Sequence, residues 1–161
     1  MSVAPARIVL LLLGIVVGVV GVRMVIDARD DPMRSARTSA QTVLVVEVVD
    51  GDTLVIGSGR HVRLIGIDTP ERDTCGYQRA SDALRSLVEG RKVRLVNPES
   101  VQDQDRYGRL LRYVDREGAD AGLDLLRVGL AVARYDSRDG YDPHPREERY
   151  HRADRAVASI C

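Results

Sequence analysis

Residues 43–67 contain three short apolar segments separated by tight turns. The segments are rich in Val, Leu and Ile, and the turns are Asp50-Gly51-Asp52 and Gly57-Ser58-Gly59. Short β-branched runs bounded by such turns are typical of antiparallel strands joined by hairpins. This part of the chain therefore predicts a β-meander. We expect its strands at residues 43–49, 53–56 and 61–67.

The residues that follow add helices and further strands. Apolar residues recur at helical spacing in residues 77–89 and 121–128. A polar loop at 136–150 and a charged helix at 146–160 complete the pattern, and two more strands are expected at 92–96 and 110–114. This order predicts an α+β fold, a five-stranded Greek-key barrel of the OB type with about three packed helices. Its core must consist of Val, Leu, Ile and Ala, because the chain has no Phe or Trp.

An entirely apolar run at residues 8–22 precedes this domain. As a helix it would span about 22 Å, which is short for a membrane helix. We expect residues 1–26 to form a hydrophobic helix that acts as a signal anchor or signal peptide, followed by a polar tether at 27–42 and the domain at 43–161. The arginines after the apolar run favour the opposite membrane orientation. Because the expected chemistry suits export, we nevertheless place the domain outside the cell membrane on a single-pass anchor, or secreted.

The charge distribution argues against a generally basic nucleic-acid-binding protein. The chain has 24 Lys and Arg against 24 Asp and Glu. Residues 1–42 hold five of the arginines and three of the aspartates, which leaves 19 cationic against 21 acidic side chains in the domain. A domain that binds phosphate with this balance must use locally placed arginines or a bound cation.

Three motifs carry the residues suited to such chemistry. They are Asp50-Gly51-Asp52-Thr53, Arg63-Leu64-Ile65-Gly66-Ile67-Asp68-Thr69-Pro70-Glu71 and Asp105-Arg106-Tyr107-Gly108-Arg109. Taken singly, each has a structural explanation, as a hairpin turn, a turn capped by an aspartate, or a pair of solvated arginines. Two aspartates and a threonine carbonyl are also the oxygen ligands that Ca²⁺ prefers.

Together and in this order, the motifs closely resemble those of the staphylococcal nuclease family. The resemblance covers residues 43–135 and includes the segment Leu125-Leu126-Arg127-Val128-Gly129-Leu130-Ala131. It implies an OB-fold, calcium-dependent nuclease that hydrolyses phosphodiester bonds of DNA, RNA or both by metal-assisted attack of water. No protein partner is implied.

The resemblance also implies roles for single residues. Asp52, Asp68 and the carbonyl of Thr69 match the Ca²⁺ ligands. Glu71 matches the residue that positions or deprotonates the attacking water, and Arg63 and Arg109 match the pair that clamps the scissile phosphate. Arg106, Tyr107 and Tyr135 match positions that contact substrate.

Two alternatives remain open on the sequence alone. A non-catalytic OB-fold module that binds single-stranded nucleic acid or a protein partner is the alternative function. The presence of Arg63, Glu71 and Arg109 together favours the enzyme, because a binding module does not need a carboxylate that positions water. Cys75 and Cys161 are the only cysteines. Their even number behind an export segment predicts a disulfide, and two free thiols are the alternative.

Overall fold

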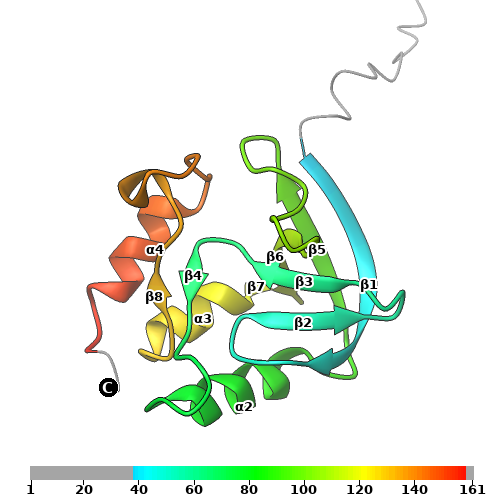
Figure 1. Cartoon of the computed structure of the whole chain (residues 1–161), viewed down its shortest axis with the longest axis horizontal. Coiled ribbons are helices and arrows are strands. Elements are labelled where there is room, and N and C mark those ends of the chain that lie inside the picture. Colours follow the sequence, from blue (N-terminus) through cyan, green and yellow to red (C-terminus); the bar gives the residue numbers. More distant parts are fainter. Residues whose placement is uncertain (1–37, 159–161) are drawn as a thin grey trace, which may run out of the picture.

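The computed structural model describes residues 38–158, and strand β1 (Thr38–Val48) is shared by both halves of its barrel (Figure 1). Residues 38–44 pair antiparallel with β5 (Lys92–Pro98), and residues 45–48 pair antiparallel with β2 (Thr53–Ile56). The register shifts between Val45 and Glu47, where the partner changes. A bulge at this point bends the strand, so that one strand can turn a corner of the barrel.

The barrel closes through a parallel pair of strands. Strand β3 (His61–Leu64) pairs antiparallel with β2 and parallel with β6 (Leu110–Arg116), which itself pairs antiparallel with β5. The ring β1-β2-β3-β6-β5 thus returns to β1. This confirms the predicted five-stranded barrel, and the architecture is consistent with an OB fold. Strand β7 (Ala119–Asp120) extends the sheet beyond β6.

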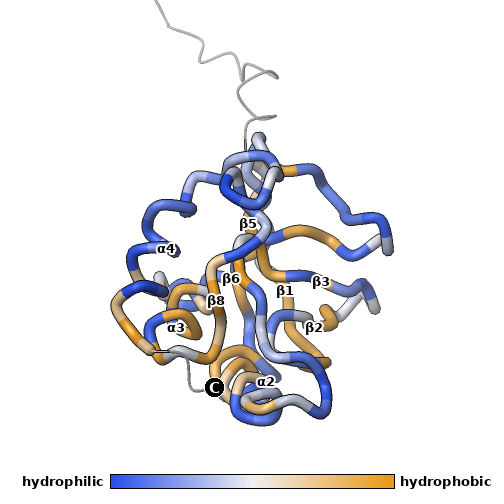
Figure 2. The backbone as a smooth tube through the Cα atoms, turned by 60° about the vertical axis from the view of Figure 1, so that its left-hand side comes forward, coloured by the Kyte–Doolittle hydropathy of each residue, from blue (hydrophilic) through white to orange (hydrophobic). Residues whose placement is uncertain are grey.

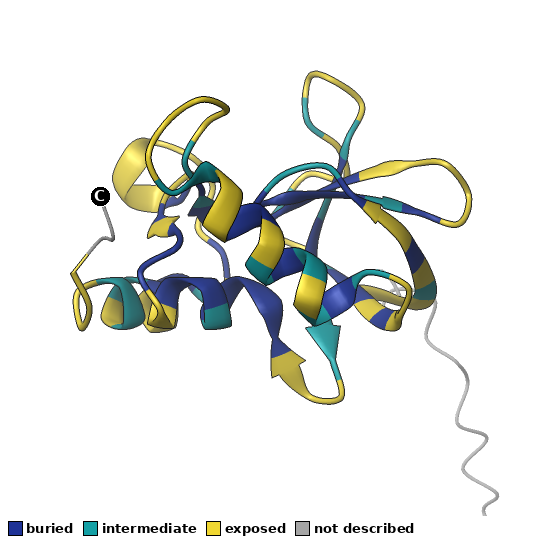
Figure 3. Cartoon of the chain, turned by 90° about the horizontal axis from the view of Figure 1, so that it is seen from below, coloured by how far each residue is buried: buried dark blue, intermediate teal, exposed yellow. Residues whose placement is uncertain are grey.

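Three α-helices accompany the barrel within the described residues, as predicted. They are α2 (Tyr77–Val88), α3 (Ala121–Arg127) and α4 (Glu147–Asp154). Helix α2 contacts β1 and α3, and α3 contacts β6 and α4. Each helix has a buried face toward the rest of the domain and an exposed face toward solvent (Figure 3). Helix α4 and the long loops are mainly hydrophilic, the barrel strands carry much of the hydrophobic sequence, and α2 has both hydrophilic and hydrophobic residues (Figure 2).

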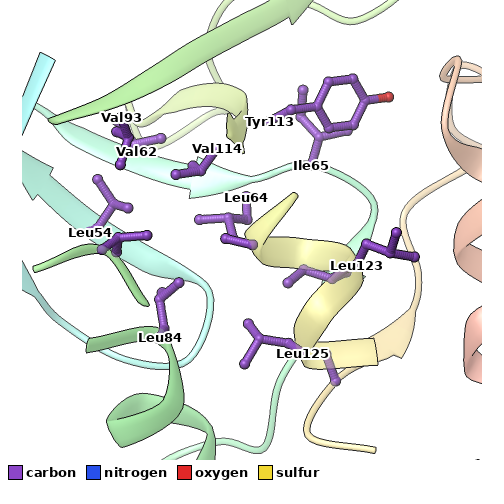
Figure 4. Close-up of a cluster of buried hydrophobic side chains, with 14 of the residues drawn as sticks. Leu54, Val62, Leu64, Ile65, Leu84, Val93, Tyr113, Val114, Leu123 and Leu125 are labelled. Carbon is purple, nitrogen blue, oxygen red and sulfur yellow. The ribbon is translucent and has the colours of Figure 1, made fainter. Parts of the chain in front are cut away.

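The core lies between the barrel and the helices. Leu54, Val62 and Leu84 are fully buried, and they meet side chains from α3 and β6 (Figure 4). Aliphatic side chains make up most of this cluster, as the composition requires, and the buried aromatic rings are Tyr113 and Tyr150. Burial of this apolar surface is the main force that holds helices and barrel together.

Strand β1 begins at Thr38, earlier than the expected start of the domain at residue 43. Residues 39–42 are exposed, so backbone pairing with β5 holds them in the sheet rather than burial of their side chains. A hydrophobic pattern could not have revealed this extension.

The prediction of one strand at residues 61–67 is wrong. Strand β3 ends at Leu64, and the separate β4 (Ile67–Asp68) pairs with β8 (Val132–Ala133). The chain turns at Gly66, whose φ of 76° is costly for residues with a side chain. This turn delivers Asp68 to a second, two-stranded sheet.

The polar segment at residues 136–150 is less loop-like than expected. It contains a 3₁₀ helix, η1 (Ser137–Asp139), and the first half of α4, which ends at Asp154 rather than at residue 160. Asp136, His144 and Glu147 are buried although they are polar. Their contacts come from distant parts of the chain, which local sequence patterns do not report.

Two predicted features lie outside the described residues. These are the apolar helix at residues 1–26, with most of the tether, and Cys161, so the anchor and the Cys75–Cys161 disulfide stay predictions. Among residues 38–158, no helix is long and apolar enough to cross a membrane.

His144 packs directly against Gly66. Its Nδ1 lies 2.8 Å from the hydroxyl of Tyr113, and burial lowers its pKa. A Cβ at residue 66 would lie 2.4 Å from Nε2 of His144. The turn that leads to Asp68 and the segment that leads to α4 are therefore in direct contact.

We predict that Gly66→Ala destabilises the fold by about 2 kcal/mol or more, because a left-handed backbone and a steric clash act together. Gly118→Ala is the matched control, since Gly118 has a φ of 85° and nothing within 4 Å of its missing Cβ. Urea unfolding measures both variants. Equal losses of stability would show that contact with His144 does not constrain the turn.

Candidate functional site

A cleft of about 870 Å³ gathers side chains from separate segments of the chain. They come from the β1–β2 turn, β3, β4 with the residues after it, the start of α2, the loop between β5 and β6, β6 itself, and the segment after β8. All nine residues expected to bind cation or substrate or to catalyse line this cleft: Asp52, Arg63, Asp68, Thr69, Glu71, Arg106, Tyr107, Arg109 and Tyr135.

Arg63 is the buried cation at the floor of the cleft, with 8% of its surface exposed. Its Nε forms an ion pair with Oδ1 of Asp52 at 3.1 Å, and its Nη2 donates to Oδ1 of Asp68, also at 3.1 Å. Its Nη1 donates to the carbonyl oxygens of Leu64 and Ile67, at 3.0 and 2.9 Å. The hydrogen bonds use both hydrogens of Nη1 and one hydrogen of Nη2, which leaves the second Nη2 hydrogen without a partner among the described residues.

Asp52 is buried and receives donors on both carboxylate oxygens. Oδ2 accepts from the backbone N and the hydroxyl of Thr69, at 3.1 and 2.8 Å, and Oδ1 accepts from the hydroxyl of Thr53 at 3.1 Å. Burial raises the pKa of Asp52 to about 6, while Arg63 opposes the rise and Asp50 adds to it. The carboxylate is therefore mainly ionised at neutral pH.

Gly51 permits this close approach. A Cβ there would lie 2.7 Å from both the Thr69 hydroxyl oxygen and the Cβ of Ala80 on α2. The hairpin turn that carries Asp52 can reach Thr69 because residue 51 has no side chain.

Asp68 lies closer to solvent, and Glu71 is exposed. Oδ1 of Asp68 also accepts from the hydroxyl of Tyr135 at 3.3 Å. In residues 38–158, no three or more His, Cys, Asp or Glu side chains gather as a metal cluster. Asp52 and Asp68 nevertheless contact the same guanidinium, so one cation could reach both carboxylates. This oxygen-only donor set fits a hard cation such as Ca²⁺, which fills its remaining positions with carbonyl groups and water.

Tyr135 covers Arg63 and has an unusual backbone conformation. Its φ is 61°, in the left-handed region, and its N donates to Oδ2 of Asp139 at 2.7 Å. The guanidinium carbon of Arg63 lies 5.5 Å from the centre of the Tyr135 ring. Backbone strain of this kind persists where surrounding contacts enforce it, and it is concentrated at functional sites.

The β5–β6 loop supplies the opposite wall. Nε of Arg109 pairs with Oδ2 of Asp105 at 2.6 Å. Arg106 lies over the ring of Tyr107, with its guanidinium carbon 4.7 Å from the ring centre, and Tyr107 is 67% exposed. An exposed aromatic ring beside two arginines can stack on a base while the arginines bind phosphate.

Tyr141 and Asp105 are among the residues of the cleft to which the sequence assigned no role. Tyr141 is 57% exposed and contacts Tyr135 edge to face, with ring centres 5.5 Å apart. It lies in the segment expected to be a polar loop, and no local pattern marks it. Asp105 was seen only as part of a motif, and its contacts depend on the folded loop.

The sequence was also compared with known proteins. The family model described as "Staphylococcal nuclease homologue" matches residues 61–156. The thermonuclease of Staphylococcus hyicus is 36% identical over 116 residues, which cover 65% of this chain and 68% of that protein. The thermonuclease of Staphylococcus intermedius is 33% identical over 117 residues, or 66% and 68% of the two chains. Endonuclease YncB of Bacillus subtilis is 35% identical over 102 residues, or 58% and 48%.

Arg63 should be far more important for stability than Arg109, although both line the cleft. Arg63→Met leaves the buried Asp52 and two carbonyl groups without their partner, and breaking such a buried pair costs about 3–5 kcal/mol. Arg109→Met breaks a partly exposed pair, which typically costs about 1 kcal/mol or less. Urea unfolding measures the free energy of unfolding of both variants. Equal stability would contradict the importance of the buried ion pair between Arg63 and Asp52.

Proposed function

The chain belongs to the staphylococcal nuclease family, and from this premise we propose that it is a nuclease that hydrolyses phosphodiester bonds of DNA, RNA or both with Ca²⁺. One observation carries the proposal. Arg63, Arg109, Glu71 and the carboxylates of Asp52 and Asp68 come from separate segments and line the same cleft.

The two arginines are suited to bind the scissile phosphate. Within residues 38–158, both Nη atoms of Arg109 and the second Nη2 hydrogen of Arg63 have no hydrogen-bond partner, so they are available as donors to phosphoryl oxygens. Attack on phosphorus increases the negative charge on these oxygens, and fixed cations stabilise that charge without having to reorganise. Arginine stays charged at neutral pH and binds two oxygens at once.

Asp52, Asp68 and the carbonyl of Thr69 would hold the Ca²⁺ ion. When bound, such an ion polarises phosphoryl oxygens and makes bound water more acidic. The pairing of Asp52 and Asp68 with Arg63 keeps both carboxylates at the floor of the cleft before any cation binds.

Glu71 would act on the water. It lines the cleft as an exposed carboxylate just after the Asp68-Thr69-Pro70 turn. From there it would orient the attacking water and accept its proton as the oxygen–phosphorus bond forms. The bond from phosphorus to the leaving oxygen would then break, and that oxygen would take a proton from solvent water.

Cleavage of end-labelled single-stranded DNA and RNA tests the proposal. The chain should cleave at least one of them with Ca²⁺ and neither with excess chelator. Glu71→Gln should lower turnover by roughly 10²–10⁴-fold, the usual contribution of a general base, without changing the melting temperature. Glu99→Gln is the matched control, because Glu99 is exposed and does not line the cleft.

Two results would reject the proposed function. Cleavage that persists in excess chelator would exclude the role of Ca²⁺. Binding of the oligonucleotides without cleavage by the unaltered chain would support the non-catalytic OB-fold module instead.

A further inference from the structure

Asp105 binds both the backbone and the side chain of the loop that carries Arg109. Its Oδ1 accepts from the backbone N of Tyr107 and of Arg109, at 2.9 and 3.0 Å. Its Oδ2 accepts from Nε of Arg109 at 2.6 Å. The side chain of Asp105 is 15% exposed and that of Arg109 is 31% exposed. One carboxylate therefore binds both the backbone N and the guanidinium group of Arg109.

The loop itself is closed by backbone hydrogen bonds. The backbone N of Asp105 donates to the carbonyl oxygen of Arg109 at 3.0 Å, and that of Gly108 donates to the carbonyl oxygen of Asp105 at 3.0 Å. Gln104 and Leu110 form a β-bridge directly beside this turn. The base of the Arg109 side chain is thus held at the start of β6. Asp105 binds its guanidinium group at Nε, and the centre of the Tyr107 ring lies 5.5 Å from the guanidinium carbon.

The contact through Nε restricts how Arg109 can bind an anion. A guanidinium group binds two oxygens either through its two Nη atoms or through Nε and one Nη. Asp105 occupies the second edge. Within residues 38–158, neither Nη atom of Arg109 has a hydrogen-bond or ion-pair partner, and Arg109 lines the cleft. The edge formed by the two Nη atoms is the one left for a ligand.

A second aspartate–arginine pair from the same part of the chain differs in this respect. Nη2 of Arg112 contacts Oδ1 of Asp103 at 2.5 Å, and Nη1 donates to the carbonyl oxygens of Asp103 and Leu111. Arg112 is buried, and neither member of this pair lines the cleft. The protein uses both Nη atoms of Arg112, whereas it leaves those of Arg109 for a ligand.

We propose that Asp105 is a positioning residue, which directs the two Nη atoms of Arg109 at the scissile phosphate. This inference rests on the proposed nuclease function. Asp105 does not touch the substrate; it acts through Arg109.

Asp105→Asn separates the hydrogen bonds to the loop backbone from the contact with Nε of Arg109. The amide oxygen can still accept from the backbone N of Tyr107 and Arg109, which preserves the turn. The amide NH₂ group then faces Nε of Arg109, so that two donors oppose each other and the guanidinium group is released. We expect kcat/KM to fall by roughly tenfold to a hundredfold, as misplaced catalytic groups generally cause, with an unchanged melting temperature.

A double-mutant cycle distinguishes positioning from a general structural role. In the Arg109→Ala background, Asp105→Asn should lower kcat/KM no further, because the residue through which it acts is gone. Asp103→Asn is the matched control with the same change of charge in the same loop, and it should leave kcat/KM of the unaltered chain within about twofold. Equal losses from Asp105→Asn in both backgrounds, or no loss in the unaltered chain, would overturn the inference.

A measurement independent of turnover tests the contact itself. In ¹⁵N NMR spectra, the Nε–H signal of Arg109, assigned from its absence in Arg109→Ala, should be protected from exchange in the unaltered chain and exposed in Asp105→Asn. An unprotected signal in the unaltered chain would overturn the inference. Failure of the unaltered chain to cleave nucleic acid would instead reject the proposed function, whatever the NMR spectra show.

Discussion

The buried guanidinium of Arg63 is the interaction on which the cleft depends. A charge removed from water is tolerated only where opposite charges and hydrogen-bond acceptors surround it. Arg63 obtains these from Asp52 on the β1–β2 turn, from Asp68 on β4, and from the carbonyl groups at the end of β3 and the start of β4. The contacts that satisfy Arg63 therefore also bring the two carboxylates together.

The segment before α4 packs against the Gly66 turn, which leads to Asp68. Gly66 lies against His144, and His144 is hydrogen-bonded to Tyr113 on β6. Arg146, two residues further along, forms a bidentate pair with Asp115 at 2.6 and 2.8 Å. These polar contacts dock the segment before α4 onto the barrel. This segment also carries Tyr141 into the cleft, so part of the wall depends on how the last helix is attached.

Much of the fold could be predicted from local patterns, since short apolar runs mark β2, β5 and β6, and apolar residues at helical spacing mark α2. The cleft residues could be predicted as well, because Asp52, Arg63, Asp68 and Arg109 lie in motifs whose spacing the family shares. Other features depend on contacts between distant segments. Residues 39–42 of β1 are exposed and lie in the sheet through pairing with β5. The burial of Asp136 and His144 follows from packing against α4 and the barrel. The role of Asp105 depends on hydrogen bonds that exist only in the closed loop.

The central claim is that Asp52 and Asp68, held together by Arg63, form a cation site. Calorimetric titration of the chain with Ca²⁺ at neutral pH tests this claim most directly, in parallel with Asp68→Asn and the exposed helix variant Asp82→Asn. We expect one bound ion per chain for the unaltered protein and for Asp82→Asn, and loss of binding in a folded Asp68→Asn. Absence of Ca²⁺ binding by the unaltered chain, or equal binding by Asp68→Asn, would contradict this claim.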